Sequence, residues 1–165
     1  MKTLYLVRHA KSSWDHPGVG DFQRPLMEAG KKRTRTVIRF IQDKEIRIDL
    51  IISSPATRAF ETAKLIAKGI HYPIGSIKPE MTIYEGNTDD ILSLIYGVPN
   101  DISGLMIVGH NPALTHLVNI FLKPGIDILP TTGVAAFSFL TDLWENIPES
   151  PSELEFLVYP KMLKK

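Results

Sequence analysis

LYLVRHAKSSW, residues 4–14, places four apolar residues directly before Arg8 and His9. A short apolar run of this kind predicts a buried β-strand. Arginine and histidine are costly to bury without partners. We therefore expect the strand to end at Arg8 and His9, and these two side chains to hold an anion such as a phosphoryl group at its open end.

Similar apolar runs recur along the chain and alternate with segments of helical periodicity. The expected strands are Leu4–Val7, Leu50–Ile52, Leu105–Val108 and Val134–Phe139, with Leu154–Tyr159 patterned as an edge strand. Apolar residues at helical spacing predict helices around 34–41 and 114–122, from about Ala56 to Lys68 and from about Thr88 to Tyr96. This alternation predicts an α/β fold of βαβ units around a mostly parallel sheet, with residues 1–165 forming a single domain.

Composition and charge exclude several classes of function. The 165 residues are 44% hydrophobic and 22% charged, as in ordinary globular proteins, and the formal net charge of +1 offers no surplus for nucleic acid or an anionic membrane. No segment reaches the roughly 20 apolar residues that span a bilayer, and the first apolar run is too short for a signal peptide. The absence of cysteine excludes disulfides, thiolate zinc sites and a cysteine nucleophile. We expect a cytoplasmic protein without nucleic-acid or membrane partners.

Polar residues follow three of the predicted core strands. They are Arg8 and His9, then Ser53, Ser54 and Arg58, and then Gly109, His110, Asn111 and Pro112. Ligands of open α/β sheets gather at the carboxyl ends of the strands, so these residues are expected to face one crevice. Ser54-Pro55 and Asn111-Pro112 each pair a good N-cap residue with proline, which predicts two helix N-termini beside that crevice.

These residue types suit phosphoryl transfer. Arg8 and Arg58 can hold one phosphate through forked, charge-assisted hydrogen bonds. A neutral His9 can attack phosphorus if its other ring nitrogen donates to a backbone carbonyl, and His110 can donate to the phosphoryl oxygens as their charge grows. The alternatives are a rim of structural ion pairs and a metal site. His110 and His116 are six residues apart without an HExxH motif or an acidic cluster, which does not favour a metal.

The same segments resemble a known family. RHA at 8–10, SSPATRAFETA at 53–63 and VGHNP at 108–112 are similar, in order and spacing, to signature segments of the histidine phosphatase superfamily, the phosphoglycerate-mutase-like proteins. RHAKSSWD, RPL at 24–26 and LPTTGVA at 129–135 resemble its SixA-type branch of phosphohistidine phosphatases. The resemblance implies a three-layer α/β/α sandwich, His9 as the phosphorylated nucleophile, a phosphate pocket of Arg8, Arg58 and His110, and neither metal nor other cofactor.

Two positions depart from the family pattern, and one role stays open. Many members carry glycine at the position of Ala10, but alanine can supply the backbone carbonyl that orients His9. Met27 stands where relatives carry a residue that caps a helix, and methionine cannot do so. The IYEG segment points to Glu85 as the general acid of mutase-like relatives, whereas SixA-type enzymes manage without one. Lys11, Ser54, Gly109 and Asn111 are expected to bind substrate.

The expected function is hydrolysis of a phosphorylated protein at phosphohistidine. No long insertion is available to cover the crevice, and an open pocket suits a phosphoryl group that protrudes from a protein. The alternatives are a broad phosphatase of small phosphate esters, a phosphoglycerate mutase, and a phosphate-binding module without turnover. A mutase needs basic residues for a second phosphate, for which Lys11 and Arg24 are the candidates.

Overall fold

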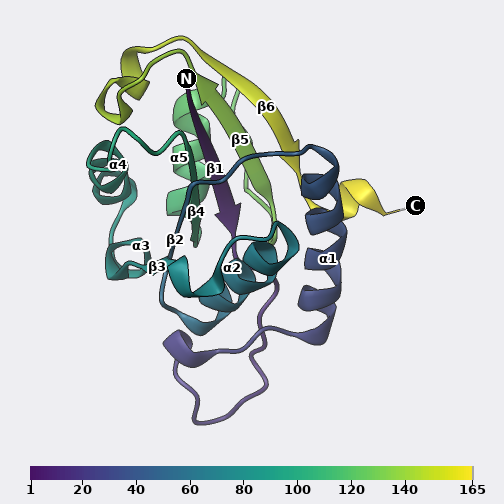
Figure 1. The fold of residues 1–165 in the computed structure, drawn as a ribbon. Coiled ribbons are helices and arrows are strands. Elements are labelled where there is room, and N and C mark those ends of the chain that lie inside the picture. The colour runs from purple at the N-terminus through teal and green to yellow at the C-terminus, as the bar shows by residue number, and fades with distance from the viewer. Residues whose placement is uncertain (165) are drawn as a thin grey trace.

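A six-stranded sheet lies between two layers of helices in the computed structural model, which describes residues 1–164 (Figure 1). The strand order is β3-β2-β4-β1-β5-β6. Neighbouring strands are parallel from β3 to β1, whereas β5 is antiparallel to β1 and β6 is antiparallel to β5. The predicted α/β/α fold with a mostly parallel sheet is therefore confirmed.

The bounds of the elements agree closely with the periodicity of the sequence. The strands are β1 (Lys2–Arg8), β2 (Leu50–Ser53), β3 (Lys78–Pro79), β4 (Gly104–Gly109), β5 (Val134–Phe139) and β6 (Ser152–Val158). The α-helices are α1 (Glu28–Asp43), α2 (Thr57–Gly69), α3 (Met81–Glu85), α4 (Thr88–Tyr96) and α5 (Ala113–Phe121). Short 3-10 helices are η1 (Asp21–Gln23), η2 (Ile74–Ser76), η3 (Trp144–Glu149) and η4 (Pro160–Leu163).

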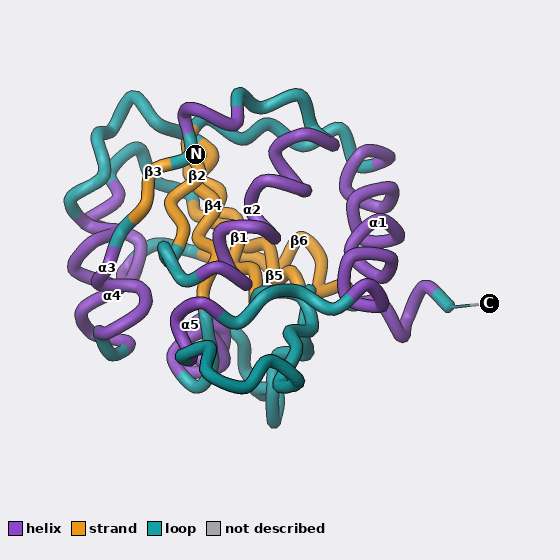
Figure 2. Tube along the Cα trace, turned by 90° about the horizontal axis from the view of Figure 1, so that it is seen from below, coloured by secondary structure: helices purple, strands orange, loops and turns teal. Residues whose placement is uncertain are grey.

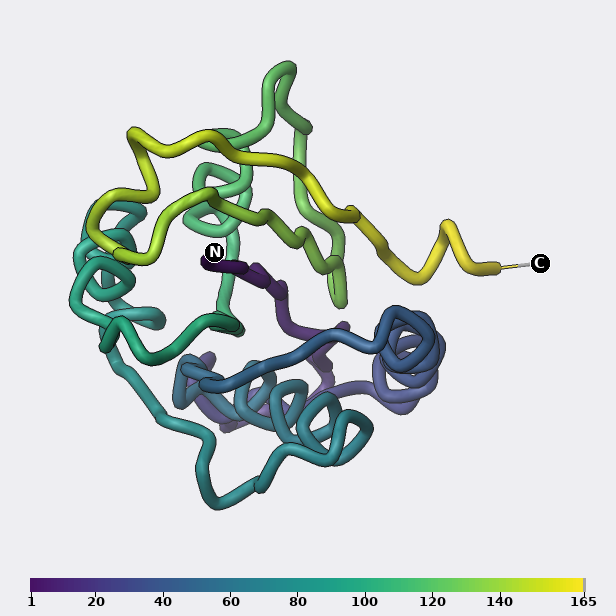
Figure 3. The backbone as a smooth tube through the Cα atoms, turned by 45° about the horizontal axis from the view of Figure 1, so that its top comes forward, coloured from purple at the N-terminus to yellow at the C-terminus, as the bar shows by residue number. Residues whose placement is uncertain are grey.

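Each face of the sheet has its own hydrophobic core. Successive side chains of a strand point to opposite faces, so Leu4 and Leu6 enter one core while Tyr5 and Val7 enter the other. Helices α1 and α2 cover the second face, and α4, α5 and η3 cover the first. Figure 2 shows the strands between the two groups of helices, and Figure 3 shows α1 and α2, in blue, across β1 from the green α5. Burial on both faces explains why β1 reads as a continuous apolar run.

Helix α2 begins later than predicted. Its N-cap is Ala56, and the preceding serine does not cap it, because Oγ of Ser54 instead accepts the N–H of Ala56 at 3.2 Å. A residue before proline is disfavoured in the helical region, and a serine turn competes with helical hydrogen bonding, so Pro55 delays the helix. The prediction of Ser54 as N-cap was wrong.

Helix α5 also starts one step later than the sequence suggests. Pro112 is its N-cap rather than its first residue. Asn111 still performs part of the capping role, since its Oδ1 accepts the N–H of Thr115 at 3.2 Å. Helix α1 begins after Met27, which makes no side-chain capping bond, as expected of methionine.

Periodicity did not reveal β3 or α3, because two and five residues are too short to show it. Pro79 is tolerated in β3 because that strand lies at the edge of the sheet. The patterned edge strand at the other side is β6, as predicted. No helix within residues 1–164 is both long and apolar enough to cross a bilayer.

Candidate active site

The carboxyl ends of the central strands β1 and β4 lie side by side, and polar residues follow both of them. Arg8 pairs with Gly109 in the parallel ladder, so His9 and His110 follow neighbouring strand ends. The N–H of His9 donates to the carbonyl of Gly109 at 3.0 Å, and the centres of the two imidazole rings are 5.2 Å apart. The parallel strands thus deliver both histidines to one place, as strand ends do in open α/β sheets.

A cavity of about 490 Å³ opens at these strand ends. Among the residues singled out in the sequence, its wall includes Arg8, His9, Lys11, Arg58, His110 and Asn111. Ser54 and Gly109 are not on that wall. Ser54 is fully buried against His110, and a Cβ at Gly109 would lie 2.7 Å from the side chain of Ile83. These two residues support the histidines instead of facing the cavity.

His9 is held in one orientation and is uncharged at neutral pH. It is 7% exposed, and its Nδ1 lies 2.7 Å from the carbonyl oxygen of Ala10. This is the contact expected from the sequence, in which the Ala10 carbonyl orients His9. Because a carbonyl can only accept, Nδ1 carries the ring proton and Nε2 keeps a lone pair. Burial lowers the pKa of His9 from 6.5 to about 4; the bond to the carbonyl opposes this shift, and nearby guanidinium charges add to it. Nε2 is therefore available as a nucleophile.

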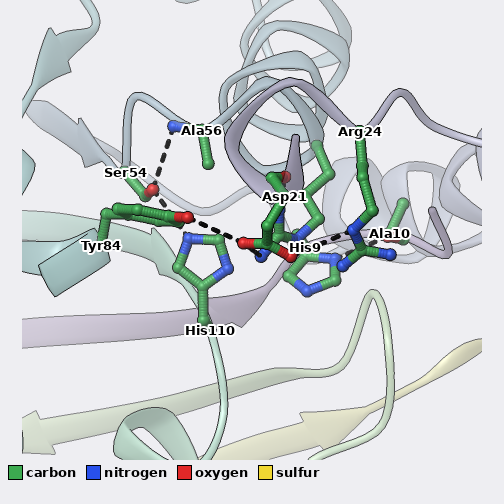
Figure 4. Close-up of polar contacts among 9 residues, drawn as sticks. His9, Ala10, Asp21, Arg24, Ser54, Ala56, Tyr84 and His110 are labelled. Atoms are coloured by element: carbon green, nitrogen blue, oxygen red, sulfur yellow. Dashed lines mark hydrogen bonds and ion pairs between the residues drawn. The ribbon is translucent and has the colours of Figure 1, made fainter. Parts of the chain in front are cut away.

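His110 is partly buried and also uncharged. Its Nε2 lies 2.7 Å from Oγ of Ser54, while its Nδ1 is buried without a partner. Burial and the neighbouring His9 lower the pKa of His110 to about 3. The ring of Tyr84 packs edge-on against His110 with 5.5 Å between the ring centres (Figure 4). A neutral imidazole in this setting has one ring proton to offer.

Three arginines, Arg8, Arg24 and Arg58, line the cavity. The sequence suggested that Arg8 and Arg58 would turn their forks to one phosphate. Instead, Nη1 of Arg58 donates to the backbone oxygen of Asp21 at 2.7 Å and Nη2 donates to its Oδ2 at 3.1 Å. Arg8 uses Nη1 on the carbonyl of Leu129 at 3.0 Å. Each of these two guanidinium groups therefore uses some of its N–H donors on protein oxygens. The remaining N–H donors are available to a ligand.

The Asp21 carboxylate organises two of these arginines. Its Oδ1 accepts from Nε of Arg24 at 3.1 Å, and its Oδ2 accepts from Arg58 and from the hydroxyl of Tyr84, the latter at 2.8 Å (Figure 4). Partial burial favours a raised pKa, but the hydrogen bonds from Tyr84 and Arg58 prevail and hold the pKa of Asp21 at about 2. Asp21 is therefore ionised near neutral pH and sets the orientation of both guanidinium groups.

Within residues 1–164, the buried side-chain nitrogen and oxygen atoms without a hydrogen-bond partner all belong to this cavity. They are Nε of Arg8, Nη1 of Arg24, Nε of Arg58 and Nδ1 of His110. A buried unsatisfied polar group costs about 1–3 kcal/mol, more if charged, and is rare in native proteins. The guanidinium nitrogens can only donate. An anion with several acceptor oxygens would satisfy these donors and complement the positive charge of the guanidinium groups.

The loop between Leu129 and Gly133 fixes the backbone of the site. Thr132 is 1% exposed and has φ of 54°, an uncommon conformation for a β-branched residue. Its N–H lies 3.1 Å from the carbonyl of Arg8 and 3.2 Å from that of His9. Arg8 returns a bond through its N–H to the carbonyl of Gly133 at 3.1 Å. The LPTTGVA segment thus holds the strand end that carries His9.

Glu85 lies outside the cavity. It is the last residue of α3, it is exposed, and it does not line the cavity wall. The preceding residue, Tyr84, turns towards the site and contacts Asp21 and His110 instead. The five-residue helix α3 therefore presents the phenol to the site and leaves the carboxylate on the surface.

Asp21 and Trp14 contribute to the site but were not predicted, and Arg24 was considered only as a basic residue for the second phosphate of a mutase. All three lie in the segment between β1 and α1, which folds back over the strand ends. The RPL segment at 24–26 was the available signal for Arg24. Nothing in the spacing of Asp21 or Trp14 reveals their partners, because those contacts come from the path of a loop.

Within the described residues, no group of three or more His, Cys, Asp or Glu side chains could hold a metal ion.

Sequence comparison relates the chain to phosphatases. Residues 4–81 match the family described as "Histidine phosphatase superfamily (branch 1)". The chain is 30% identical over 156 residues to an uncharacterized chloroplastic protein of Arabidopsis thaliana, a match that covers 88% of this chain and 70% of that protein. It is 32% identical over 76 residues to the uncharacterized phosphatase PhoE of Bacillus subtilis, covering 45% of this chain and 38% of PhoE.

Solved structures share the whole fold. The "putative phosphohistidine phosphatase SixA" of Agrobacterium tumefaciens superposes with a TM-score of 0.78 at 27% identity, covering 96% of this chain and 98% of that one. A protein histidine phosphatase SixA in complex with tungstate superposes with a TM-score of 0.82 at 17% identity, covering 98% and 99% of the two chains.

Proposed function

Because the chain belongs to the histidine phosphatase superfamily, and within it to the SixA-type group, we propose that it hydrolyses protein phosphohistidine through a phosphorylated His9. Membership of that superfamily supports phosphatase activity. The proposal adds the nucleophile, the supporting residues, the independence from metal and the kind of substrate.

The unsatisfied nitrogens carry this proposal. Arg8, Arg24, Arg58 and His110 each leave one buried nitrogen without a partner, and all four line the same cavity as His9. A phosphoryl group brings several acceptor oxygens and negative charge, so its binding would satisfy donors that the protein leaves unpaired. Three guanidinium groups also supply the positive charge that phosphoryl transfer needs without a metal ion.

The first step forms a bond between phosphorus and Nε2 of His9. The lone pair on Nε2 attacks, the P–N bond to the substrate imidazole breaks, and its electron pair stays on the substrate nitrogen. In the second step, water attacks phosphorus, the bond to Nε2 breaks, a water proton passes to solvent, and inorganic phosphate leaves. His9 returns to its neutral form with its proton still on Nδ1, where the Ala10 carbonyl holds it.

His110 and the arginines stabilise the charge that develops on the phosphoryl oxygens. Oγ of Ser54 accepts the N–H of Ala56, and its own proton is free to donate to Nε2 of His110. In the proposed arrangement Ser54 donates to Nε2, and the proton of the His110 ring is on Nδ1, the atom left without a protein partner. Preorganised donors of this kind contribute most when they match the transition state.

The acid-base properties of the site favour a nitrogen leaving group. Asp21 has a pKa of about 2, so it is ionised and cannot donate a proton near neutral pH. Glu85 lies off the wall, and Asp15 lies on the exposed rim. A phosphoramidate needs less acid assistance than an alkyl phosphate, because its leaving nitrogen can already carry a proton. The likeness to the Agrobacterium protein at 27% identity supports the same substrate class.

The experiment combines a substrate panel with capture of the intermediate. Purified wild-type protein and His9→Ala are assayed on a phosphohistidine carrier protein, a phosphotyrosine peptide and phosphoglycerate. We expect the wild type to prefer the carrier protein and His9→Ala to be inactive. A reaction quenched without acid should leave labelled phosphate on the wild-type protein that survives alkali and is lost in acid.

The possible results separate the alternatives. An adduct that alkali removes, or turnover by His9→Ala, would exclude His9 as the nucleophile. Turnover of small esters alone would replace the proposed substrate by small phosphate esters. Transfer of phosphate between positions of phosphoglycerate would indicate a mutase, and binding of phosphate without any turnover would indicate a binding module.

A further inference from the structure

The cavity has a buried cationic floor and an exposed rim. His9, Arg24 and Arg58 are 7%, 8% and 6% exposed. The exposed residues on the wall are Lys11, Trp14 and Asp15, all from the segment that follows β1. Trp14 is 78% exposed and lines the same cavity as His9.

The indole of Trp14 is fixed on one face and open on the other. The guanidinium carbon of Arg24 lies 3.4 Å from the centre of the indole, within the range of a cation–π contact. Arg24 is in turn tied to Asp21 through Nε. One face of the indole stacks on a guanidinium that is buried and hydrogen-bonded to Asp21. This contact fixes the orientation of the ring and leaves its other face exposed.

An exposed and oriented tryptophan at a cavity mouth is typical of a binding surface. Large aromatic side chains dominate the energetics of interfaces, and a fixed ring loses little conformational entropy when a partner stacks on it. The other tryptophan of the chain, Trp144, is fully buried and donates Nε1 to the carbonyl of Ile102 at 2.8 Å. Packing in the core explains a tryptophan at position 144, but it cannot explain the exposed tryptophan at position 14.

A second hollow of about 100 Å³ adjoins the first beyond this ring. Trp14 and Arg24 line both hollows, and His16 and Val19 line the second. The surface around Trp14 therefore continues beyond the space that a phosphoryl group fills. It suits a substrate that extends from the phosphorylated ring, as a protein chain does.

We propose that Trp14 is the stacking platform for the aromatic ring that carries the phosphoryl group, the imidazole of a phosphohistidine in the substrate protein. This inference rests on the proposed function. His9 attacks phosphorus from the floor, so the leaving group departs on the opposite side of phosphorus, towards the mouth. Trp14 is the aromatic residue of the rim, and the exposed face of its indole can stack on a planar imidazole.

The test separates stacking on the leaving group from support of Arg24. Wild type, Trp14→Leu and Trp14→Phe are compared on two phosphoramidates, a phosphohistidine peptide and the phosphoramidate ion, whose leaving group has no ring. Leucine can still cover the guanidinium of Arg24 but cannot stack as an aromatic ring, whereas phenylalanine can do both.

We expect Trp14→Leu to lower the ratio of the two kcat/KM values, peptide over ion, by about two- to twelve-fold. That factor corresponds to about 0.5–1.5 kcal/mol for an aromatic pair, at 1.4 kcal/mol for each factor of ten. Trp14→Phe should keep most of the ratio. An unchanged ratio in Trp14→Leu, with both values lowered together, would overturn the proposal, because it would show that Trp14 acts only through Arg24.

Fluorescence gives a second readout. Because the chain has two tryptophans and Trp144 is buried, a stacked ring should change the emission of Trp14. Titration of His9→Ala with the phosphohistidine peptide should change emission, and the change should be absent in His9→Ala/Trp14→Phe. A signal that persists in the double variant would refute the stacking. Failure of the proposed function is distinct, since wild type would then neither cleave the peptide nor form an adduct on His9.

Discussion

Replacing His9 tests the electrostatic account of the site through stability rather than activity. Burial holds the pKa of His9 at about 4 in the folded protein, compared with about 6.5 in an unfolded chain. At pH 5 the unfolded chain binds nearly one proton at this residue, whereas the folded protein binds about a tenth of one. Acid therefore favours unfolding, because the unfolded state takes up the proton that the folded site refuses.

The size of the effect follows from the two pKa values. The penalty is absent well above pH 6.5, grows as the pH falls towards 4, and reaches a limit of about 3.4 kcal/mol for a difference of 2.5 pKa units. At pH 5 it amounts to about 2 kcal/mol relative to pH 8. A His9→Asn variant lacks this penalty, while every other titrating group is shared with the wild type.

The assay is urea unfolding followed by circular dichroism between pH 8 and pH 5. We expect the free energy of unfolding of wild type to fall by about 2 kcal/mol more than that of His9→Asn over this range. The slope of free energy against urea should be the same in both proteins, so that the difference reports stability alone. Parallel pH curves for the two proteins would refute the argument that burial keeps His9 uncharged.

Three further substitutions test catalysis and packing. Arg58→Met should lower kcat on a phosphohistidine substrate by about 10²–10³-fold, the usual cost of one transition-state donor, whereas the same change at the exposed Arg39 should not. Gly30→Ala would bring a Cβ to 2.4 Å from a backbone oxygen of the loop after β1, so the free energy of unfolding in urea should fall by about 1–3 kcal/mol. Gly75→Ala is the control and should show no such fall, because its Cβ meets nothing within 4 Å. Lys2→Met removes the buried donor to two carbonyls at 2.6 and 2.9 Å, so the free energy of unfolding should fall by about 1–3 kcal/mol while kcat stays at the wild-type value.

The position of Lys2 explains why stability and activity separate in that variant. Lys2 opens β1, and the cavity lies at the other end of the strand, beyond Arg8. Its ammonium group lies 5.5 Å from the ring centre of Trp144. A loss of activity in Lys2→Met at full folding would contradict this placement.

The sequence alone predicted the sheet, the main helices and the grouping of polar residues at strand ends. This was possible because β1, β4 and β5 are buried on both faces and therefore read as apolar runs of strand length. The polar residues that follow parallel strands are brought together by the topology of the sheet itself. Local signals were less reliable at the helix starts, where Pro55 and Pro112 shifted α2 and α5.

Only the tertiary structure decided how the guanidinium groups are used and what surrounds the mouth. Asp21 holds Arg24 and Arg58, and Trp14 covers Arg24, through the path of a loop that has no periodicity to read. Glu85 and Tyr84 are adjacent in sequence, yet the turn of a five-residue helix places one outside and the other beside His110. Patterns along a chain report burial in regular elements, whereas contacts between loops depend on where distant segments meet in space.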